Sequence, residues 1–303
     1  MKSENETMTS THSFTCCITF DFDGMSSWIG SARSRNPSMI SRGQFGAVAM
    51  PRILDLLESY EIPSSFAVPG HTAYAYPQLV KDIHAAGHEL VHHGWVHENP
   101  AEFDEAGERN LLDRGLEALE KVAGTRPIGY RSPAWDFSER TVDLLIEYGF
   151  LYDSSCMGHD YYPYYLRTGD KWDTDTAYEF GDVTELVELP VTWGLDDFPV
   201  SEFVMGMNEG LRAPSAVEES WRDDFDYGKA NCPGGLFTLT LHPQTIGRGN
   251  RMLMLERLLQ HFKDSGAIFE TMADYALRWK ENNPREAWVS AHPELSGEGA
   301  IKP

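Results

Sequence analysis

The chain has 303 residues and carries 47 acidic against 25 basic side chains, and this formal net charge of −22 argues against nucleic acids and anionic membranes as partners. No apolar run reaches the ~18 residues of a membrane-spanning helix, so no transmembrane segment is expected. Length alone would allow two domains, but α/β barrels often reach this size as a single domain.

The hydrophobic pattern predicts strands that alternate with helices along the chain. An apolar and β-branched run from Cys16 to Phe20 ends at two aspartates and Gly24, which indicates a buried strand that stops at a turn. Further strands are expected over residues 64–68, 88–93, 128–132, 151–155, 186–193, 236–241 and 267–270. Helices are expected over residues 50–60, 77–86, 102–122, 138–148, 214–225, 251–262 and 272–280.

Two segments between these elements lack a clear period. Residues 26–42 are polar, contain Trp28 and are expected to form a long loop that is functional or mobile. Residues 159–185 are rich in Tyr, Trp, Asp and Gly, and we expect an elaborated loop region there. Its aromatic side chains, together with Trp28, could cover a pocket or stack on sugar rings, or they could simply be core residues.

Strands that alternate with helices predict parallel β/α units, and about seven such units would close into an irregular barrel. We expect a disordered tail over residues 1–13, one barrel domain over residues 14–285 and a loose C-terminal tail over residues 286–303. Barrel enzymes carry their chemistry at the carboxyl ends of the strands. Polar or aromatic side chains follow five of the predicted strands and indicate one shared site: Asp21, Asp23, His93, His97, Arg131, Trp193 and His242.

The cysteines and the start of the chain bear on its compartment. Four cysteines without a C-x-x-C pair indicate reduced, buried thiols rather than a disulfide framework: Cys16, Cys17, Cys156 and Cys232. Residues 1–12 are polar and carry no apolar signal segment. We therefore expect a cytoplasmic protein.

Asp21 and Asp23 lie two residues apart at the end of the first predicted strand, so their side chains should point to the same face. Two carboxylates on one face repel each other unless a cation or a shared proton lies between them. The alternative is a solvated turn, because Asp and Gly are common turn residues. A turn would not explain the hydrophobic run that precedes them.

His93 and His97 are spaced four residues apart, and on a helical turn this spacing places two imidazoles close enough to bind one metal ion. Asp23 would complete a set of two histidines and one carboxylate, with a position left open. Asp21 would then stand beside the metal as a general base. The alternative is that these histidines are ordinary surface or core residues.

Four motifs, in this order and spacing, resemble those of the polysaccharide deacetylase (NodB-type, carbohydrate esterase 4) superfamily. They are Thr19-Phe20-Asp21-Phe22-Asp23, His93-x-x-x-His97, Arg131-Ser132-Pro133-x-Trp135 and Leu241-His242-Pro243, and the resemblance runs from about Phe14 to Tyr275. It implies a distorted (β/α)7 barrel that hydrolyses an amide or ester bond with a divalent metal, most often zinc.

The resemblance also implies a role for each matching residue. Asp21 would be the catalytic base, Arg131 would orient it, and His242 would be the general acid. The metal ligands would be Asp23, His93 and His97, and Trp135 and Trp193 would line the substrate pocket. Apart from the resemblance, we expect Trp28 to contact the substrate from the early loop.

Three departures from the usual family pattern, at Phe22, Met25 and Gly94, resemble one branch of the superfamily. That branch contains peptidoglycan-deacetylase-like proteins, cyclic imide hydrolases and metal-independent allantoinases. With no export signal and a strongly negative charge, a small soluble cyclic imide or amide is favoured over an N-acetylated sugar or peptidoglycan. A barrel that binds a ligand without catalysis is the alternative from another class. The branch also suggests a homo-oligomer.

Overall fold

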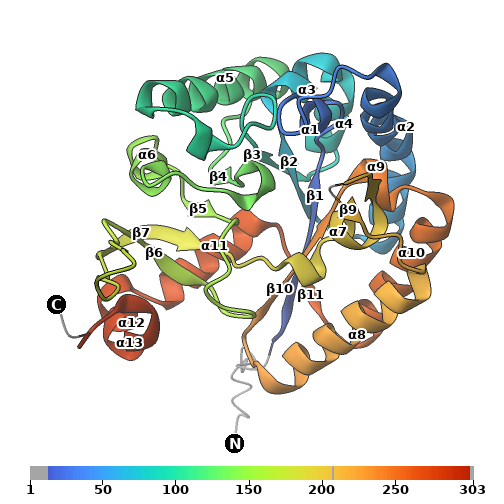
Figure 1. The fold of residues 1–303 in the computed structure, drawn as a ribbon. Helices are drawn as coiled ribbons and strands as arrows, with labels where there is room; N and C mark the ends of the chain where they lie inside the picture. Colours follow the sequence, from blue (N-terminus) through green and yellow to red (C-terminus); the bar gives the residue numbers. More distant parts are fainter. Residues whose placement is uncertain (1–12, 207, 301–303) are drawn as a thin grey trace, which may run out of the picture.

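The computed structural model describes residues 13–206 and 208–300 and contains one large sheet surrounded by helices (Figure 1). The strands pair in the order β10-β1-β2-β3-β4-β5-β7-β6, and β11 pairs with the start of β1. All of these pairings are parallel except that of β6 with β7. The strands of this sheet are β1 (Thr15–Asp21), β2 (Ser64–Val68), β3 (Glu89–His92), β4 (Gly129–Tyr130), β5 (Tyr152–Asp153), β6 (Tyr164–Thr168), β7 (Asp182–Glu188), β10 (Leu236–Leu241) and β11 (Ile268–Phe269).

The sheet curls into a half-barrel whose path ends at β10 on one side and at β6 on the other, within the residues described. This confirms the predicted α/β class and the NodB-type fold, and the distortion of the barrel is this opening. The parallel register of β1 with β10, from Thr15 with Leu236 to Phe20 with Leu241, brings the carboxyl ends of the strands to one edge. A second, two-stranded sheet pairs β8 (Phe203–Val204) with β9 (Asn208–Glu209).

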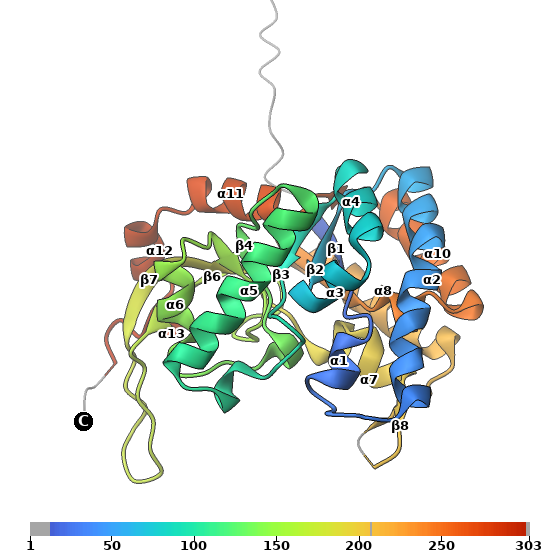
Figure 2. The ribbon, with the colours of Figure 1, turned by 90° about the horizontal axis from the view of Figure 1, so that it is seen from above.

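Helices cover the outer side of the curled sheet (Figure 2). Among them, α2 packs on α9, α3 on α5, and α8 on α10. The α-helices are α1 (Ser26–Ile29), α2 (Pro37–Tyr60), α3 (Gly70–Ala75), α4 (Pro77–Ala85), α5 (Glu105–Ala123), α6 (Thr141–Glu147), α7 (Asp197–Ser201), α8 (Pro214–Asn231), α9 (Pro243–Ile246), α10 (Gly249–Asp264), α11 (Met272–Asn282), α12 (Arg285–Ala291) and α13 (Pro293–Ser296). The 3-10 turns are η1 (Pro100–Glu102), η2 (Pro133–Trp135) and η3 (Trp193–Leu195).

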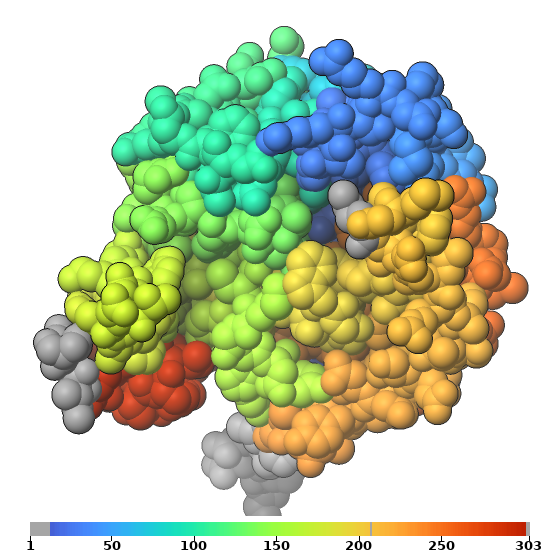
Figure 3. All heavy atoms as spheres, viewed as in Figure 1, coloured from blue at the N-terminus to red at the C-terminus, as the bar shows by residue number. Residues whose placement is uncertain are grey.

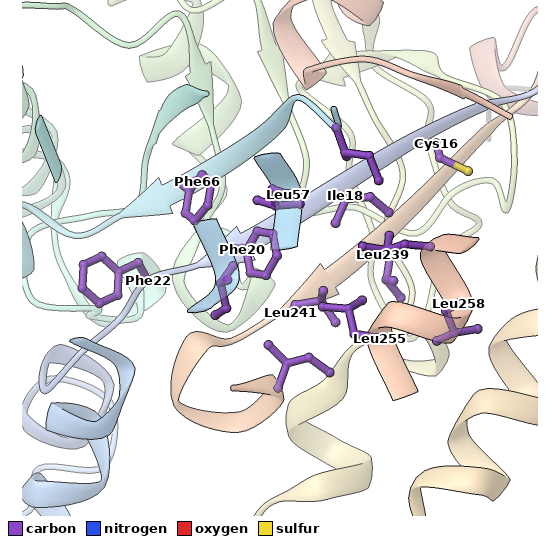
Figure 4. Close-up of a cluster of buried hydrophobic side chains, with 14 of the residues drawn as sticks. Cys16, Ile18, Phe20, Phe22, Leu57, Phe66, Leu239, Leu241, Leu255 and Leu258 are labelled. Carbon is purple, nitrogen blue, oxygen red and sulfur yellow. The ribbon is translucent and has the colours of Figure 1, made fainter. Parts of the chain in front are cut away.

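The alternation of side chains along β1 separates the core from the site. Cys16, Ile18 and Phe20 are fully buried in the layer between the sheet and its outer helices, where Phe20 stacks on Phe66 with ring centroids 4.9 Å apart (Figure 4). Every second residue faces the inside of the half-barrel instead. Asp21 belongs to that inner set.

The structure corrects the expected loop over residues 26–42. Only residues 30–36 lie outside helices, because α1 begins at Ser26 and α2 begins at Pro37, 13 residues before its predicted start. The side chain of Asn36 caps α2 and a proline follows at its first position. Gly43 and Gly46 weaken the apolar pattern of this part of the helix, and glycine is needed at position 43 because a Cβ there would lie 2.0 Å from the Gly24 carbonyl oxygen.

Two other expectations are also revised. The region 159–185 is not a loop throughout, because it contains β6 and the start of β7, which form an antiparallel hairpin. Residues 285–296 form α12 and α13 rather than a loose tail, and Trp288 packs against Tyr165 with ring centroids 5.5 Å apart. Most of the predicted N-terminal tail, residues 1–12, lies outside the described residues. No helix in the described ranges is long and apolar enough to cross a membrane.

Candidate active site

Asp21 and Asp23 face one cleft at the carboxyl edge of the sheet. Phe22 between them points the opposite way, is fully buried and packs on Tyr76 with ring centroids 6.0 Å apart. Gly24 then takes a φ of 56°, a left-handed conformation that favours glycine, and turns the chain away from the strand. Both aspartates line the cleft, as the alternation along the strand predicts.

Asp23 meets both predicted histidines. Its Oδ1 lies 3.4 Å from His93 Nε2 and 3.6 Å from His97 Nε2, and all three side chains are buried. Within the described chain, neither Asp23 Oδ1 nor His93 Nε2 has a hydrogen-bond partner. A buried polar atom without a partner is costly, and here two such atoms converge with a third lone-pair donor. The group therefore fits a divalent metal ion.

The outer ring nitrogens of both histidines are occupied. His93 Nδ1 lies 2.7 Å from the Arg131 carbonyl oxygen, which can only accept, so Nδ1 carries the proton. His97 Nδ1 lies 2.5 Å from Ser31 Oγ, which itself donates to the His97 carbonyl oxygen at 2.6 Å, so this Nδ1 also donates. In its neutral form each ring therefore presents an Nε2 lone pair toward Asp23, as metal-binding histidines do.

The two histidines do not lie on a helical turn, which corrects the sequence interpretation. β3 ends at His92, and the chain turns back through left-handed conformations at Gly94, with φ of 70°, and His97, with φ of 63°. The carboxylate of Glu98 closes this turn by accepting the backbone N–H groups of Trp95 and Val96. The ring centroids of His93 and His97 consequently lie 5.0 Å apart.

Burial and the neighbouring charges shift the pKa values of Asp23, His97 and His93. Burial by itself would raise the pKa of Asp23, but His97, His93 and His242 outweigh burial and hold it well below its usual range. Burial lowers the pKa of His97 to about 4, so this ring is neutral near pH 7 and its lone pair is free for a metal. At His93, burial would lower the pKa, but Asp21 and Asp23 outweigh burial and raise it.

Arg131 forms a buried ion pair with the other aspartate of the cleft, Asp21. Its Nη1 donates to Asp21 Oδ1 at 2.8 Å and to Thr19 Oγ1 at 2.8 Å, while Nε and Nη2 donate to the carbonyl and hydroxyl oxygens of Ser154. The guanidinium is completely buried. These contacts fix Oδ1 of Asp21. The other oxygen, Oδ2, faces the candidate metal ligands and lies 3.9 Å from His93 Nε2.

His242 approaches the same group from the end of β10. Its Nε2 lies 3.8 Å from Asp23 Oδ2, and its Nδ1 lies 2.8 Å from Asp197 Oδ1, which also accepts the backbone N–H of His242. Asp196 Oδ1 lies 3.6 Å from Nδ1. Burial would lower the pKa of His242, but these carboxylates outweigh burial and raise it well above its usual value. The ring is therefore suited to donate a proton at neutral pH.

The cleft has a volume of about 450 Å³ and is walled by aromatic rings. In Figure 3 it is the hollow where the blue, green and yellow parts of the surface meet. Trp28 is buried in its wall beneath the guanidinium of Arg42, 4.8 Å from the ring centroid. Trp135 and Trp193 face each other with ring centroids 4.2 Å apart, and Trp193 is 44% exposed at the mouth.

The structure thus brings all nine predicted site residues to one place and adds others that the sequence interpretation missed. Asp196 and Asp197 follow the end of a predicted strand, so the rule that placed His242 could have found them. Gln244 lies three residues after a predicted strand, as Asp196 does, so the same rule could have found it, whereas Ser31 carried no such signal. Gln244 Nε2 lies 3.5 Å from Asp23 Oδ2, and Ser31 lies in the segment that was expected to form a functional or mobile loop.

Comparisons with known proteins identify the family of this chain. The sequence profile of the family described as "Polysaccharide deacetylase" matches residues 15–152. A peptidoglycan deacetylase from Helicobacter pylori is 35% identical over 281 residues, which cover 88% of this chain and 96% of that protein. The chain belongs to the polysaccharide deacetylase family. A peptidoglycan deacetylase-like protein from Gibberella zeae is 31% identical over 84% of this chain and 82% of its own length.

Solved structures extend the match to the fold. A structure from Mycobacterium smegmatis that is assigned to the polysaccharide deacetylases covers 91% of this chain and 93% of its own, with 34% identity and a TM-score of 0.80. The PuuE allantoinase shares the fold, with a TM-score of 0.73 at 22% identity over 92% of this chain and 93% of its own. Members of this deacetylase family hydrolyse carbon–nitrogen bonds of amides, and the predicted enzyme class is confirmed.

Proposed function

We propose that this family member is a zinc-dependent hydrolase that cleaves the carbon–nitrogen bond of a small cyclic imide or amide. The observation that supports a metal is the convergence of two buried atoms without partners, Asp23 Oδ1 and His93 Nε2, on the free Nε2 of His97. Two histidines and a carboxylate are a common zinc set in hydrolases. A divalent ion held there would supply a Lewis acid that polarises the substrate carbonyl.

The proton transfers fall to residues of the chain itself. Asp21 takes a proton from the attacking water at Oδ2, because Arg131 occupies its other oxygen. His242 gives a proton from Nε2 to the leaving nitrogen, while Asp197 holds Nδ1 and fixes the orientation of the ring. The tetrahedral species collapses when the nitrogen receives that proton.

The size of the cleft supports a small substrate. Its volume of about 450 Å³ is within the ~300–1,000 Å³ typical of small-molecule sites. Trp28, Trp135 and Trp193 line the same cleft as the candidate metal ligand Asp23. The facing rings of Trp135 and Trp193 narrow its mouth. A planar cyclic imide would stack against the face of such a ring, because aromatic rings stack on flat, partly apolar groups.

N-deacetylation of an N-acetylglucosamine-containing saccharide is the second candidate. The exposed face of Trp193 at the mouth could stack on a sugar ring that lies outside the cleft, with only the acetamide inserted. The relatives that match nearly the whole chain are named for peptidoglycan. Both candidates use the same carbonyl, water and leaving nitrogen, so they differ in the substrate and not in the roles of the residues.

A single proton NMR time course separates the candidates. Zinc-loaded protein is mixed with a cyclic imide and a short N-acetylglucosamine oligomer together. A ring-opened half-amide without acetate supports the imide hydrolase, whereas acetate without ring opening supports the deacetylase and rejects our first choice. Zinc content is measured beside it for the wild type and Asp23→Ala. Equal and negligible zinc in both would reject the metal site.

Two further parts of the proposal concern the setting of the enzyme. A small soluble substrate is consistent with a cytoplasmic enzyme, and the described cysteines are free thiols. Cell fractionation with a native-length chain tests this location. We also propose a homo-oligomer, and a monomer in sedimentation at micromolar concentration would reject it.

A further inference from the structure

A second pair of buried carboxyl groups lies behind the active site, on neighbouring strands. Asp153 at the end of β5 and Glu188 at the end of β7 are cross-strand partners, and both are completely buried. Asp153 Oδ2 and Glu188 Oε2 have no donor of their own within the described chain. Two carboxylates buried on neighbouring strands repel each other, whereas one proton shared between them makes a strong hydrogen bond.

Each carboxyl group uses its other oxygen to hold the segment Ser154-Ser155-Cys156. Glu188 Oε1 accepts the backbone N–H groups of Ser155 at 3.0 Å and Cys156 at 2.9 Å. Asp153 Oδ1 accepts the hydroxyl of Ser155 at 2.8 Å. This segment has no regular secondary structure. These three bonds hold it together with backbone bonds from Ser154 N–H to the Tyr130 carbonyl oxygen at 3.0 Å and from Val191 N–H to the Cys156 carbonyl oxygen at 3.1 Å.

The same segment holds the arginine of the active site. Arg131 Nε donates to the Ser154 carbonyl oxygen at 3.1 Å, and Nη2 donates to Ser154 Oγ at 3.0 Å. The Ser155 hydroxyl accepts the backbone N–H of Ser132, next to Arg131, at 2.8 Å. A continuous set of hydrogen bonds therefore links the carboxyl pair to Arg131 and from there to Asp21.

We propose that Asp153 and Glu188 share one proton and act as positioning residues for Arg131, holding the Ser154–Cys156 segment so that the guanidinium meets Asp21 in one orientation. Neither residue touches the cleft, and both act only through this segment. The inference rests on the proposed function in one respect, which is the role of Arg131 beside the catalytic base.

The groups that face the pair support a single shared proton. Burial raises the pKa of Asp153 to about 6, and burial together with the charge of Asp153 raises the pKa of Glu188 well above its usual value. Arg131, the cation that faces them, is already paired with Asp21. The remaining neighbours are neutral acids whose pKa values are raised chiefly by burial: Tyr130, Cys156 and Tyr164. Arg167 lies near Cys156 and partly offsets the rise in the pKa of that thiol.

A cation between the pair and the Cys156 sulfur is the competing explanation, since these three groups lie within 4.8 Å of one another. Burial, Glu188 and Asp153 raise the pKa of the Cys156 thiol well above its usual range, so the cysteine stays a neutral thiol when no cation is bound. One proton satisfies both free oxygens without ionising the cysteine. Metal analysis distinguishes the two explanations directly.

The test compares Glu188→Gln with Glu188→Ala. Glutamine keeps the Oε1 acceptor for the segment, and its amide N–H replaces the shared proton, whereas alanine removes both. We expect kcat of E188Q to stay within about threefold of the wild type, and kcat of E188A to fall by about 10²-fold through misplacement of Arg131, with KM changed far less. Glu108→Gln is the matched control, because Glu108 is also buried and hydrogen-bonded but lies away from Arg131.

The pH profile reports the proton itself. The carboxyl pair keeps its proton at low pH and loses it as the pH rises. The kcat of the wild type should therefore fall at alkaline pH, because the two carboxylates then repel each other. E188Q carries a permanent N–H and should lack that loss, while E108Q should keep the wild-type profile. Infrared spectra should also show a protonated carboxyl band that E188Q removes.

Each of three results on activity, pH profile or metal content would overturn the inference: equal activity in E188A and E188Q, a wild-type profile in E188Q, or a second metal equivalent that E188Q abolishes. The Nε–H NMR signal of Arg131 keeps this test separate from the proposed function. It should stay sharp in E188Q and broaden in E188A even if no substrate is turned over. A signal unchanged in E188A would reject the positioning role, whereas inactivity of the wild type on every amide would reject only the proposed function.

Discussion

Replacing Asp197 by asparagine removes a charge from beside His242 and leaves the shape of the side chain nearly unchanged. In the native protein Asp197 Oδ1 accepts two hydrogen bonds from His242, from Nδ1 at 2.8 Å and from the backbone N–H at 2.9 Å. The variant keeps the backbone contact. What it loses is the negative charge that favours the protonated ring.

The size of the effect follows from these contacts. A hydrogen bond to a charged group contributes about 1.5–3 kcal/mol, and one between neutral groups about 0.5–1.5 kcal/mol. The exchange therefore weakens the hold on protonated His242 by ~1–1.5 kcal/mol, and kcat should fall about tenfold, since ~1.4 kcal/mol is a factor of ten. Asp197→Ala removes both contacts and should cost about 10²–10⁴ in kcat, the usual contribution of a general acid.

The assay is steady-state hydrolysis of the substrate that the NMR experiment identifies. KM should change little, because Asp197 is completely buried behind His242 and does not line the cleft. An aryl ester, whose leaving group departs without a proton, should be affected much less than an amide by either variant. Asp226→Asn is the matched control, because Asp226 makes a similar 2.7 Å contact with His261 on the outer helices. The acid role would be refuted if D197A kept wild-type kcat on an amide, or if D226N lost as much.

Four other changes test separate parts of the structure. Chelation of the metal, or His97→Ala, should abolish amide hydrolysis and lower bound zinc below one equivalent, and full activity of the metal-free protein would contradict the site. Arg131→Lys keeps the charge but cannot reach Asp21 and Ser154 together, so kcat should fall by about 10²-fold, and a smaller loss on KM than on kcat is expected. Gly94→Ala gives a residue with a side chain a φ of 70° and places its Cβ 3.0 Å from Pro133. The free energy of unfolding should therefore fall by about 1–2 kcal/mol, and zinc affinity should drop with it. Unchanged zinc affinity would show that the turn tolerates the substitution. Trp288→Ala should destabilise the fold by about 3 kcal/mol in urea, and a loss near zero would mean that α12 does not stabilise the sheet.

The sequence by itself determined the strand-end chemistry. The alternation along β1 placed Asp21 and Asp23 on one face, and the rule that parallel strands present their carboxyl ends at one edge gathered the histidines and Arg131 beside them. It also predicted the α/β class, because apolar strands alternate with amphipathic helices throughout. Local signals of this kind depend on neighbouring residues, so they survive without knowledge of the tertiary structure.

Other features depend on contacts between segments far apart in the chain. The start of α2 was hidden because Gly43 and Gly46 weaken its apolar pattern, and only the close approach of the Gly24 backbone explains why glycine is needed at position 43. The C-terminal helices were expected to be a loose tail, because the packing of Trp288 on Tyr165 joins distant segments and leaves no local signal in the sequence.

The tertiary structure alone decided how the site is organised. His97 lies in a left-handed turn and not on a helix, and the closure of that turn by Glu98 has no periodic signature in the sequence. Asp197 reaches His242 across 45 residues of sequence, and the proton that we assign to Asp153 and Glu188 exists only because two strands bring two acids together out of water. Charge, burial and distance act in three dimensions, and a linear pattern records none of them.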